Sequence, residues 1–114
     1  MGSTYRKNKG MVDPRIIETV KNYLMLIPDD LGVKKVYLFG SFAKGKEREE
    51  SDIDVAIILN NMSDFFSTQR QLMKLRRSVD LRIEPHPINE KDFNTMNPFA
   101  SEIQRTGIEI KFDA

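Results

Sequence analysis

Apolar and polar positions along the first half of the chain alternate between a helical and a strand pattern. Apolar residues recur at three- and four-residue spacing over residues 16–27, after Asp13 and Pro14, which suit an N-cap and a first-turn proline. We expect this helix to end at Pro28. A short β-rich run over residues 36–39 stops at Gly40 and predicts a strand. The nearly continuous apolar run 53–59 is typical of a central strand covered on both faces.

The second half continues the alternation. Residues 64–77 lack Gly and Pro and carry apolar residues at helical spacing, so they predict a second amphipathic helix. Residues 79–83 alternate as a third strand, which we expect to stop before Pro85 and Pro87. A short helix near Asn89, a helix over 98–105 and a short terminal strand complete the pattern. The prediction is therefore an α/β (α+β) domain over residues 13–114, with residues 1–12 as a flexible N-terminal segment.

Composition narrows the functional classes. The chain has 114 residues, 39% of them hydrophobic, which suits one domain with one core. No apolar run approaches the roughly 18 residues of a membrane span, and we expect no membrane partner. The net charge of +1 gives no reason to expect nucleic acid as a partner. The absence of Cys excludes disulfides and thiolate metal sites and is compatible with a cytoplasmic location.

Gly40 and Ser41 form the first half of the stretch that carries chemistry. Gly40 ends one predicted strand, and a helix is expected to begin at Ser41. Backbone N–H groups at such a junction suit a phosphate, and the Ser41 hydroxyl can add a donor. Because Gly40 has no Cβ, a ligand can approach the backbone closely.

Asp52 and Asp54 form the second half. Side chains two apart on a strand share a face, so these carboxylates project together and repel each other unless a cation lies between them. Mg²⁺ with its oxygen ligands resolves that conflict. Asp80, in the predicted third strand, can complete a three-carboxylate cluster that suits two metal ions. Taken singly, each feature has a plain structural explanation: a turn, a solvated face and an edge residue. Their combination favours a site.

These residues resemble a known family. Gly40-Ser41 with Ala43-Lys44-Gly45, followed by Ser51-Asp52-Ile53-Asp54, is similar to the signature of the DNA polymerase β nucleotidyltransferase superfamily, and closest to its minimal nucleotidyltransferases. The resemblance runs from about residue 38 to residue 80. It implies a mixed, twisted β-sheet with helices packed on it. It also implies Mg²⁺-dependent transfer of a nucleoside monophosphate from ATP or another nucleoside triphosphate to an acceptor hydroxyl.

The resemblance also implies residue roles. Gly40 and Ser41 would hold the triphosphate, with Lys44 at a position where the family often has Arg. Asp52 and Asp54 would bind metal. Asp80 would bind the metal nearer the acceptor and help to deprotonate it.

Three functions compete. The leading one is an antitoxin-type enzyme that transfers AMP to a partner, by resemblance a HEPN-domain protein from an adjacent gene. The second is a non-catalytic module of the same fold that neutralises or scaffolds a partner, and the third is transfer to a small molecule. An intact three-carboxylate set favours catalysis, and the lack of a substrate-binding domain argues against the third.

Two further sets of residues have ordinary explanations at this level. His86 lies between two prolines, where an exposed loop histidine is expected. Phe65, Phe66, Phe93 and Phe99 are expected in the core or at an interface.

Overall fold

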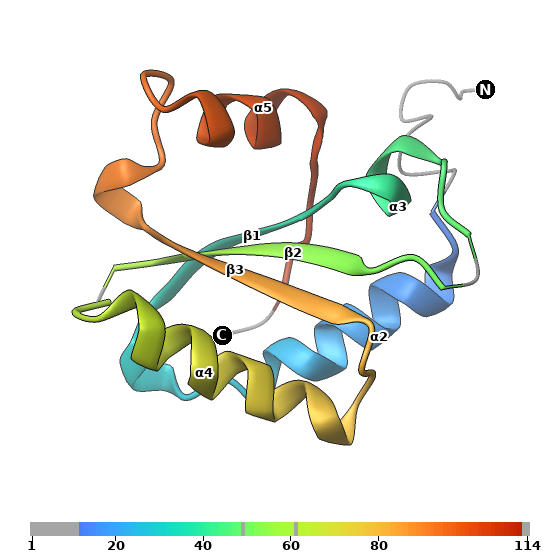
Figure 1. Ribbon diagram of the computed structural model, residues 1–114, viewed down its shortest axis with the longest axis horizontal. Helices are drawn as coiled ribbons and strands as arrows, with labels where there is room; N and C mark the ends of the chain where they lie inside the picture. The colour runs from blue at the N-terminus through green and yellow to red at the C-terminus, as the bar shows by residue number, and fades with distance from the viewer. Residues whose placement is uncertain (1–11, 49, 61, 113–114) are drawn as a thin grey trace.

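A four-stranded mixed sheet forms the centre of the molecule (Figure 1). The protein is described from a computed structural model, which covers residues 12–48, 50–60 and 62–112. Across the sheet the strand order is β3-β2-β1-β4. The β1 strand is antiparallel to both β2 and β4, whereas β2 and β3 are parallel. A parallel pair needs a crossover connection, which α4 supplies here.

The elements alternate as the sequence predicts. Their bounds are α2 Pro14–Leu24, a 3₁₀ turn Asp29–Leu31, β1 Val33–Phe39, α3 Ser41–Lys44, β2 Ile53–Leu59, α4 Phe65–Leu75, a 3₁₀ turn Arg76–Ser78, β3 Ile83–Asn89, a 3₁₀ turn Glu90–Asp92, α5 Pro98–Thr106 and β4 Ile108–Glu109. Asp13 caps α2 by accepting from the N–H of Arg15, with Pro14 in the first turn. The mixed α+β fold class and the central strand over 53–59 are confirmed.

Both faces of the sheet are covered. Figure 1 shows α2 and α4 on one side of the sheet and α5 on the other. Odd-numbered residues of β2, such as Val55 and Ile57, are buried toward α2 and α4. Even-numbered residues such as Ala56 and Ile58 are buried with Ile103 of α5. Burial on both faces explains why residues 53–59 form an apolar run with little alternation.

The third strand lies later in the chain than predicted. The expected strand over residues 79–83 is wrong, because β3 begins at Ile83 and contains both Pro85 and Pro87. The carbonyl of Arg82 accepts from Ile53 on β2, so even-numbered residues here turn their backbone groups to β2 and odd-numbered ones turn theirs outward. Proline is tolerated on an edge strand where its missing N–H would face outward. The two prolines therefore mark the free edge of the sheet and not the end of the strand.

Two expectations concern the ends and surroundings of the domain. Residues 1–11 of the expected flexible segment lie outside the described residues, whereas Val12, its last residue, is buried in the core. None of the helices within the described ranges is both long and apolar enough to span a bilayer.

Candidate functional site

The two halves of the motif meet because β1 and β2 pair in antiparallel register. Phe39, the last residue of β1, lies opposite Asp54 near the start of β2. Gly40 follows with φ of 76°, a conformation that side chains rarely adopt. A Cβ at Gly40 would overlap Oδ2 of Asp54 and lie 3.2 Å from its Cγ. The space that a side chain would fill at Gly40 is therefore occupied by the Asp54 carboxylate.

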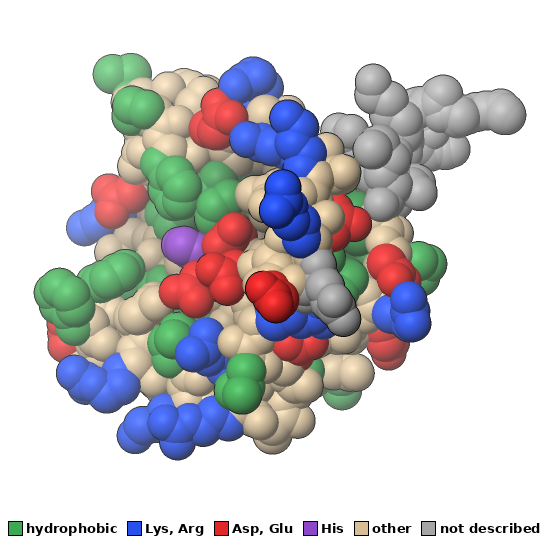
Figure 2. Space-filling model, turned by 45° about the vertical axis from the view of Figure 1, so that its right-hand side comes forward, with side chains coloured by type: hydrophobic (Ala, Val, Ile, Leu, Met, Phe, Trp, Pro, Cys, Tyr) green, Lys and Arg blue, Asp and Glu red, His purple; other side chains and the backbone are tan. Residues whose placement is uncertain are grey.

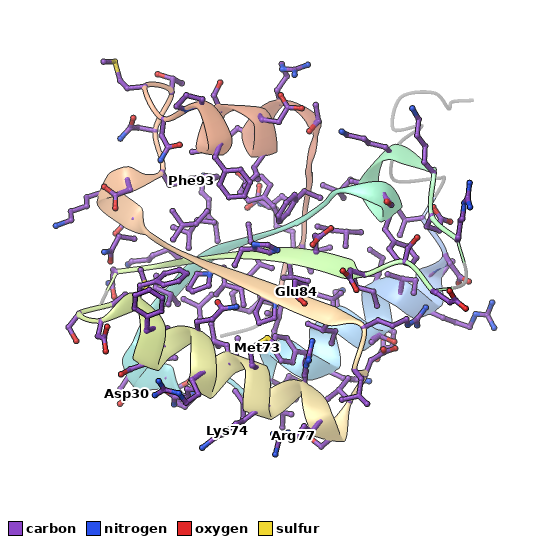
Figure 3. The ribbon with its side chains drawn as sticks, viewed as in Figure 1. Asp30, Met73, Lys74, Arg77, Glu84 and Phe93 are labelled. Carbon is purple, nitrogen blue, oxygen red and sulfur yellow. The ribbon has the colours of Figure 1, made fainter. Side chains whose placement is uncertain are left out.

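A second carboxylate lies in the same row of the sheet. Asp54 pairs with Glu84 on the parallel strand β3, and directly paired residues project from the same face. Both residues lie at the beginning of their strands, and Oε1 of Glu84 also lies 3.5 Å from Nη1 of Arg76, the residue that follows α4. Figure 3 marks Glu84 on β3, and Figure 2 shows acidic side chains gathered on this side of the molecule. The sheet thus makes neighbours of Asp54 and Glu84.

Asp52 lies in the loop just before β2. Its side chain is exposed. The loop is folded by a backbone bond from the N–H of Ser51 to the carbonyl of Arg48 and by a return bond from the N–H of Arg48 to Oγ of Ser51, 2.8 Å long. Asp52 is therefore accessible two positions before Asp54.

Asp80 does not lie on a strand, which corrects the prediction. It sits in the turn before β3, where Oδ1 accepts from the N–H and Nε of Arg82 and Oδ2 accepts from Nη2 at 2.8 Å. The Arg82 guanidinium, through these side-chain bonds, holds the pKa of Asp80 below its usual range. Both carboxylate oxygens are thus engaged locally, and the register position beside Asp54 belongs to Glu84.

His86 is part of this cluster and not an exposed loop residue. It lies on β3, and its Nε2 is 3.2 Å from Oδ1 of Asp54. Its ring contacts Phe39 of β1 edge-on at 5.0 Å between centroids and lies 6.3 Å from Phe99 of α5. Asp54 therefore lies between His86, which contacts it, and Gly40, where the missing Cβ leaves room for its carboxylate.

The predicted phosphate site lies at the start of a very short helix, α3. A helix begins at Ser41 as expected, but α3 is a single turn of four residues, so its dipole contributes little. What remains are the N–H groups of its first turn, which have no partner within the helix, and the half-buried Ser41. Lys44 is exposed at the last position of the turn.

The donor chemistry suits a hard divalent cation. Carboxylate oxygens of Asp52, Asp54 and Glu84 are the ligands that Mg²⁺ prefers. Within the parts of the chain that the structure describes, no three His, Asp or Glu side chains already converge on one point as a metal site. The fit of the site to Mg²⁺ rests on the paired positions of Asp54 and Glu84 and on the carboxylate chemistry of these residues and Asp52.

Sequence reasoning missed Glu84 and His86. The signal was present, because Ile83, Pro85 and Pro87 are buried and alternate with the less buried Glu84 and His86 in the manner of a strand. The prediction that the third strand stops before Pro85 and Pro87 concealed this alternation.

Comparison with known proteins defines the class. The model of the polymerase β nucleotidyltransferase family matches residues 16–113. The Methanocaldococcus jannaschii protein named "Putative protein adenylyltransferase MJ0141" is 34% identical over 100 residues, which cover 83% of this chain and 98% of that protein. These likenesses and the fold define a nucleotidyltransferase. The chain belongs to the polymerase β nucleotidyltransferase family.

Solved structures share the fold. A toxin–antitoxin crystal structure with AMP-PNP has a TM-score of 0.59 and 21% identity, over 85% of this chain and 73% of that one. A crystal structure of the toxin–antitoxin MntA-HepT has a TM-score of 0.55 and 18% identity, over 89% of this chain and 74% of that one. Identities this low show a shared fold alone. That fold is the one that the sequence resemblance implies.

Proposed function

We propose that this nucleotidyltransferase transfers AMP from ATP, with Mg²⁺, to a hydroxyl on a partner protein in an antitoxin-type module. The proposed partner is a HEPN-domain protein encoded by an adjacent gene, and the proposed location is the cytoplasm. The name of the M. jannaschii relative and the nucleotide and toxin–antitoxin context of the structural neighbours support this assignment.

The observation that carries the proposal is that the Asp54 carboxylate fills the space that a Cβ at Gly40 would occupy. It supports the proposal because the carboxylate that would hold metal lies next to the start of α3, whose N–H groups would hold phosphate. A triphosphate that binds together with Mg²⁺ would need both kinds of group, carboxylates for the metal and backbone donors for phosphate oxygens.

The roles follow from these positions. Gly40, Ser41 and Lys44 would hold the triphosphate, and Asp52 and Asp54 would hold the metal that travels with it. Mg²⁺, when bound, would supply charge neutralisation at the phosphates. We place Glu84, in the position first given to Asp80, as the carboxylate beside the acceptor.

The transfer balances without another reactant. The acceptor oxygen forms a bond to the α-phosphorus, the bond from that phosphorus to the bridging oxygen breaks, and pyrophosphate leaves. The proton of the acceptor hydroxyl passes to a carboxylate, for which Glu84 is placed, and then to solvent.

Calorimetry with ATP tests the nucleotide site. We expect binding with Mg²⁺ and little binding with EDTA, because unneutralised carboxylates repel a triphosphate. Asp54→Asn should lose the Mg²⁺-dependent binding, whereas Glu18→Gln, an exposed change on α2, should keep it. Equal binding with and without Mg²⁺ would remove the metal site.

Co-expression with the product of the adjacent gene tests the acceptor. Intact mass should show the partner heavier by one or more AMP units when the parent chain is present, and unchanged with Asp54→Asn. A partner that binds but stays unmodified with ATP and Mg²⁺ would favour the non-catalytic alternative.

A further inference from the structure

A groove with a mixed apolar and polar lining lies along the free edge of the sheet beside the carboxylates. The groove, here called the β3 groove, has a volume of about 500 Å³ and runs between the start of α4, the second half of β3 and the start of α5. Its apolar lining includes Met62, Phe65, Pro87, Ile88 and Phe99.

The β3 groove is continuous with the candidate catalytic site. His86 lines the groove and also contacts Asp54 at 3.2 Å. Phe99 lines the groove and packs edge-on against Phe39, 5.6 Å between centroids, in the same row as Asp54. Figure 2 shows the single histidine beside the acidic side chains, with hydrophobic side chains next to it. A chain seated in the groove would therefore reach the carboxylates directly.

Exposed apolar side chains gather around this groove. Phe65 and Phe99 line it while remaining 45% and 46% exposed. Phe66, 72% exposed, packs edge-on against Phe65, and Met96 precedes the groove residue Asn97. Two exposed aromatic residues at the start of a helix beside a groove are typical of a protein interface.

The charge of the lining argues against ATP as the occupant. Among the described lining residues there is no Lys or Arg, and Asp92 adds a negative charge. A triphosphate needs cations or clustered N–H groups, which this groove does not offer. The lining instead favours an occupant that is neutral or cationic and amphipathic, because Ser63, Gln69 and Asn97 lie in the groove together with the apolar residues.

The backbone of β3 argues against an added strand. Pro85 and Pro87 remove two outward N–H groups from the free edge, and the outward carbonyl of Ile83 already accepts from Nη1 of Arg76 at 2.9 Å. Strand addition depends on main-chain hydrogen bonds along such an edge. An amphipathic helix binds by side chains alone and fits this groove.

We propose that the β3 groove docks an amphipathic helix of the acceptor protein and so presents the acceptor hydroxyl to Asp54 and Glu84. This inference rests on the proposed transfer to a partner protein. The other cavities near exposed apolar residues, about 460 and 510 Å³, lie beside Met25 and Phe112 and contain no motif residue. The surface beside these two cavities serves as the control in the test of the proposal.

Site-specific photocrosslinking tests the docking. The chain carries benzoylphenylalanine at position 66, beside the groove, or at position 25, where Met25 is similarly exposed at 80%. It is incubated with α-labelled ATP, Mg²⁺ and a lysate of the source cells, and then irradiated. We expect a labelled crosslinked protein from position 66 and none from position 25, with the crosslinked peptide of the acceptor mapping to an amphipathic helix.

Kinetics on the acceptor identified in this way complete the test. Phe65→Glu should raise the KM for the acceptor about tenfold or more, which is the effect of an interface anchor. It should leave the affinity for ATP with Mg²⁺ unchanged. A negative charge at the first position of α4 suits the helix dipole, so the fold is expected to survive. Met25→Glu should change the KM less than twofold.

The outcomes separate the two proposals. If the labelled acceptor crosslinks from position 25, crosslinks equally from both positions or crosslinks from neither, the groove assignment is wrong while protein modification stands. An unchanged KM in Phe65→Glu would overturn the groove assignment in the same way. If no protein becomes labelled at all, the proposed function fails and the docking proposal with it.

Discussion

Replacing Gly40 with alanine should damage both stability and function, and the two costs can be separated. Gly40 combines φ of 76° with ψ of −149°, a backbone conformation essentially restricted to glycine, so alanine there costs on the order of 1–3 kcal/mol. The added Cβ would also overlap Asp54 Oδ2, so the carboxylate must move by on the order of 1 Å, a displacement that costs about 10²-fold in rate at a reacting centre.

Gly32 offers a matched control. It also has a positive φ, 66°, and a Cβ there would overlap Oδ1 of Asn60. Asn60 is exposed and lies at the far end of β2, so its side chain can move away at no cost to the site. Gly32, whose ψ is 59°, lies in the left-handed helical region, where alanine costs roughly 1–2 kcal/mol, so Gly32→Ala controls for the strain of a positive φ without displacing Asp54.

Thermal unfolding and label transfer from ATP measure the two costs. Gly32→Ala should lose roughly 1–2 kcal/mol and Gly40→Ala on the order of 1–3 kcal/mol, seen as a fall in Tm of several degrees per kcal/mol. Only Gly40→Ala should lose about 10²-fold in kcat/KM. Equal losses of activity in the two variants, or parent activity in Gly40→Ala, would refute the link between Gly40 and Asp54.

The remaining predictions concern other members of the site. Glu84→Gln should keep binding of ATP with Mg²⁺ but transfer at least tenfold more slowly, while Asp80→Asn should transfer near the parent rate. The opposite ranking in a transfer assay would restore Asp80 to the metal site. Ser41→Ala should weaken nucleotide binding by about 1–3 kcal/mol in calorimetry, the value of one hydrogen bond to a charged group. His86→Gln, which keeps a donor for Asp54, should preserve transfer better than His86→Phe; equal rates would mean that the 3.2 Å contact has no role. Because the folded-state pKa of Asp80 is lowered, its contribution to stability is present above about pH 4 and is lost as the pH falls through the folded value; Asp80→Asn should flatten this acid limb in chemical denaturation.

Local patterns predicted the central strand and the start of the first helix. The run 53–59 forms β2 with the predicted bounds, and Asp13 with Pro14 starts α2 as expected. Both elements depend on residues that are close in sequence, and a hydrophobic or capping pattern can therefore predict them.

The third carboxylate could not be placed in this way. Asp80 and Glu84 are four positions apart, so both have the same parity in an alternating pattern, and the sequence alone does not choose between two registers. The register is set by contacts between residues that are far apart in sequence: β3 pairs Glu84 with Asp54, and Pro85 and Pro87 face the free edge. The contact between Asp54 and Gly40 likewise depends on the pairing of β1 with β2.

The absorbance of Tyr23 can report on the packing of α2 against α4. Its hydroxyl is buried and donates to the carbonyl of Leu72 at 2.7 Å, which joins α2 to α4 on the face of the sheet opposite the site. Burial raises the pKa of Tyr23, so the neutral phenol belongs to the folded chain, and the stabilisation it represents is lost as alkaline pH approaches the folded value. Burial also raises the pKa of Tyr37, so in a Tyr37→Phe variant of this protein, which has no tryptophan, phenolate absorbance that rises late in an alkaline titration would report on Tyr23 and the junction of these two helices. Nucleotides bound across the sheet would leave that signal undisturbed.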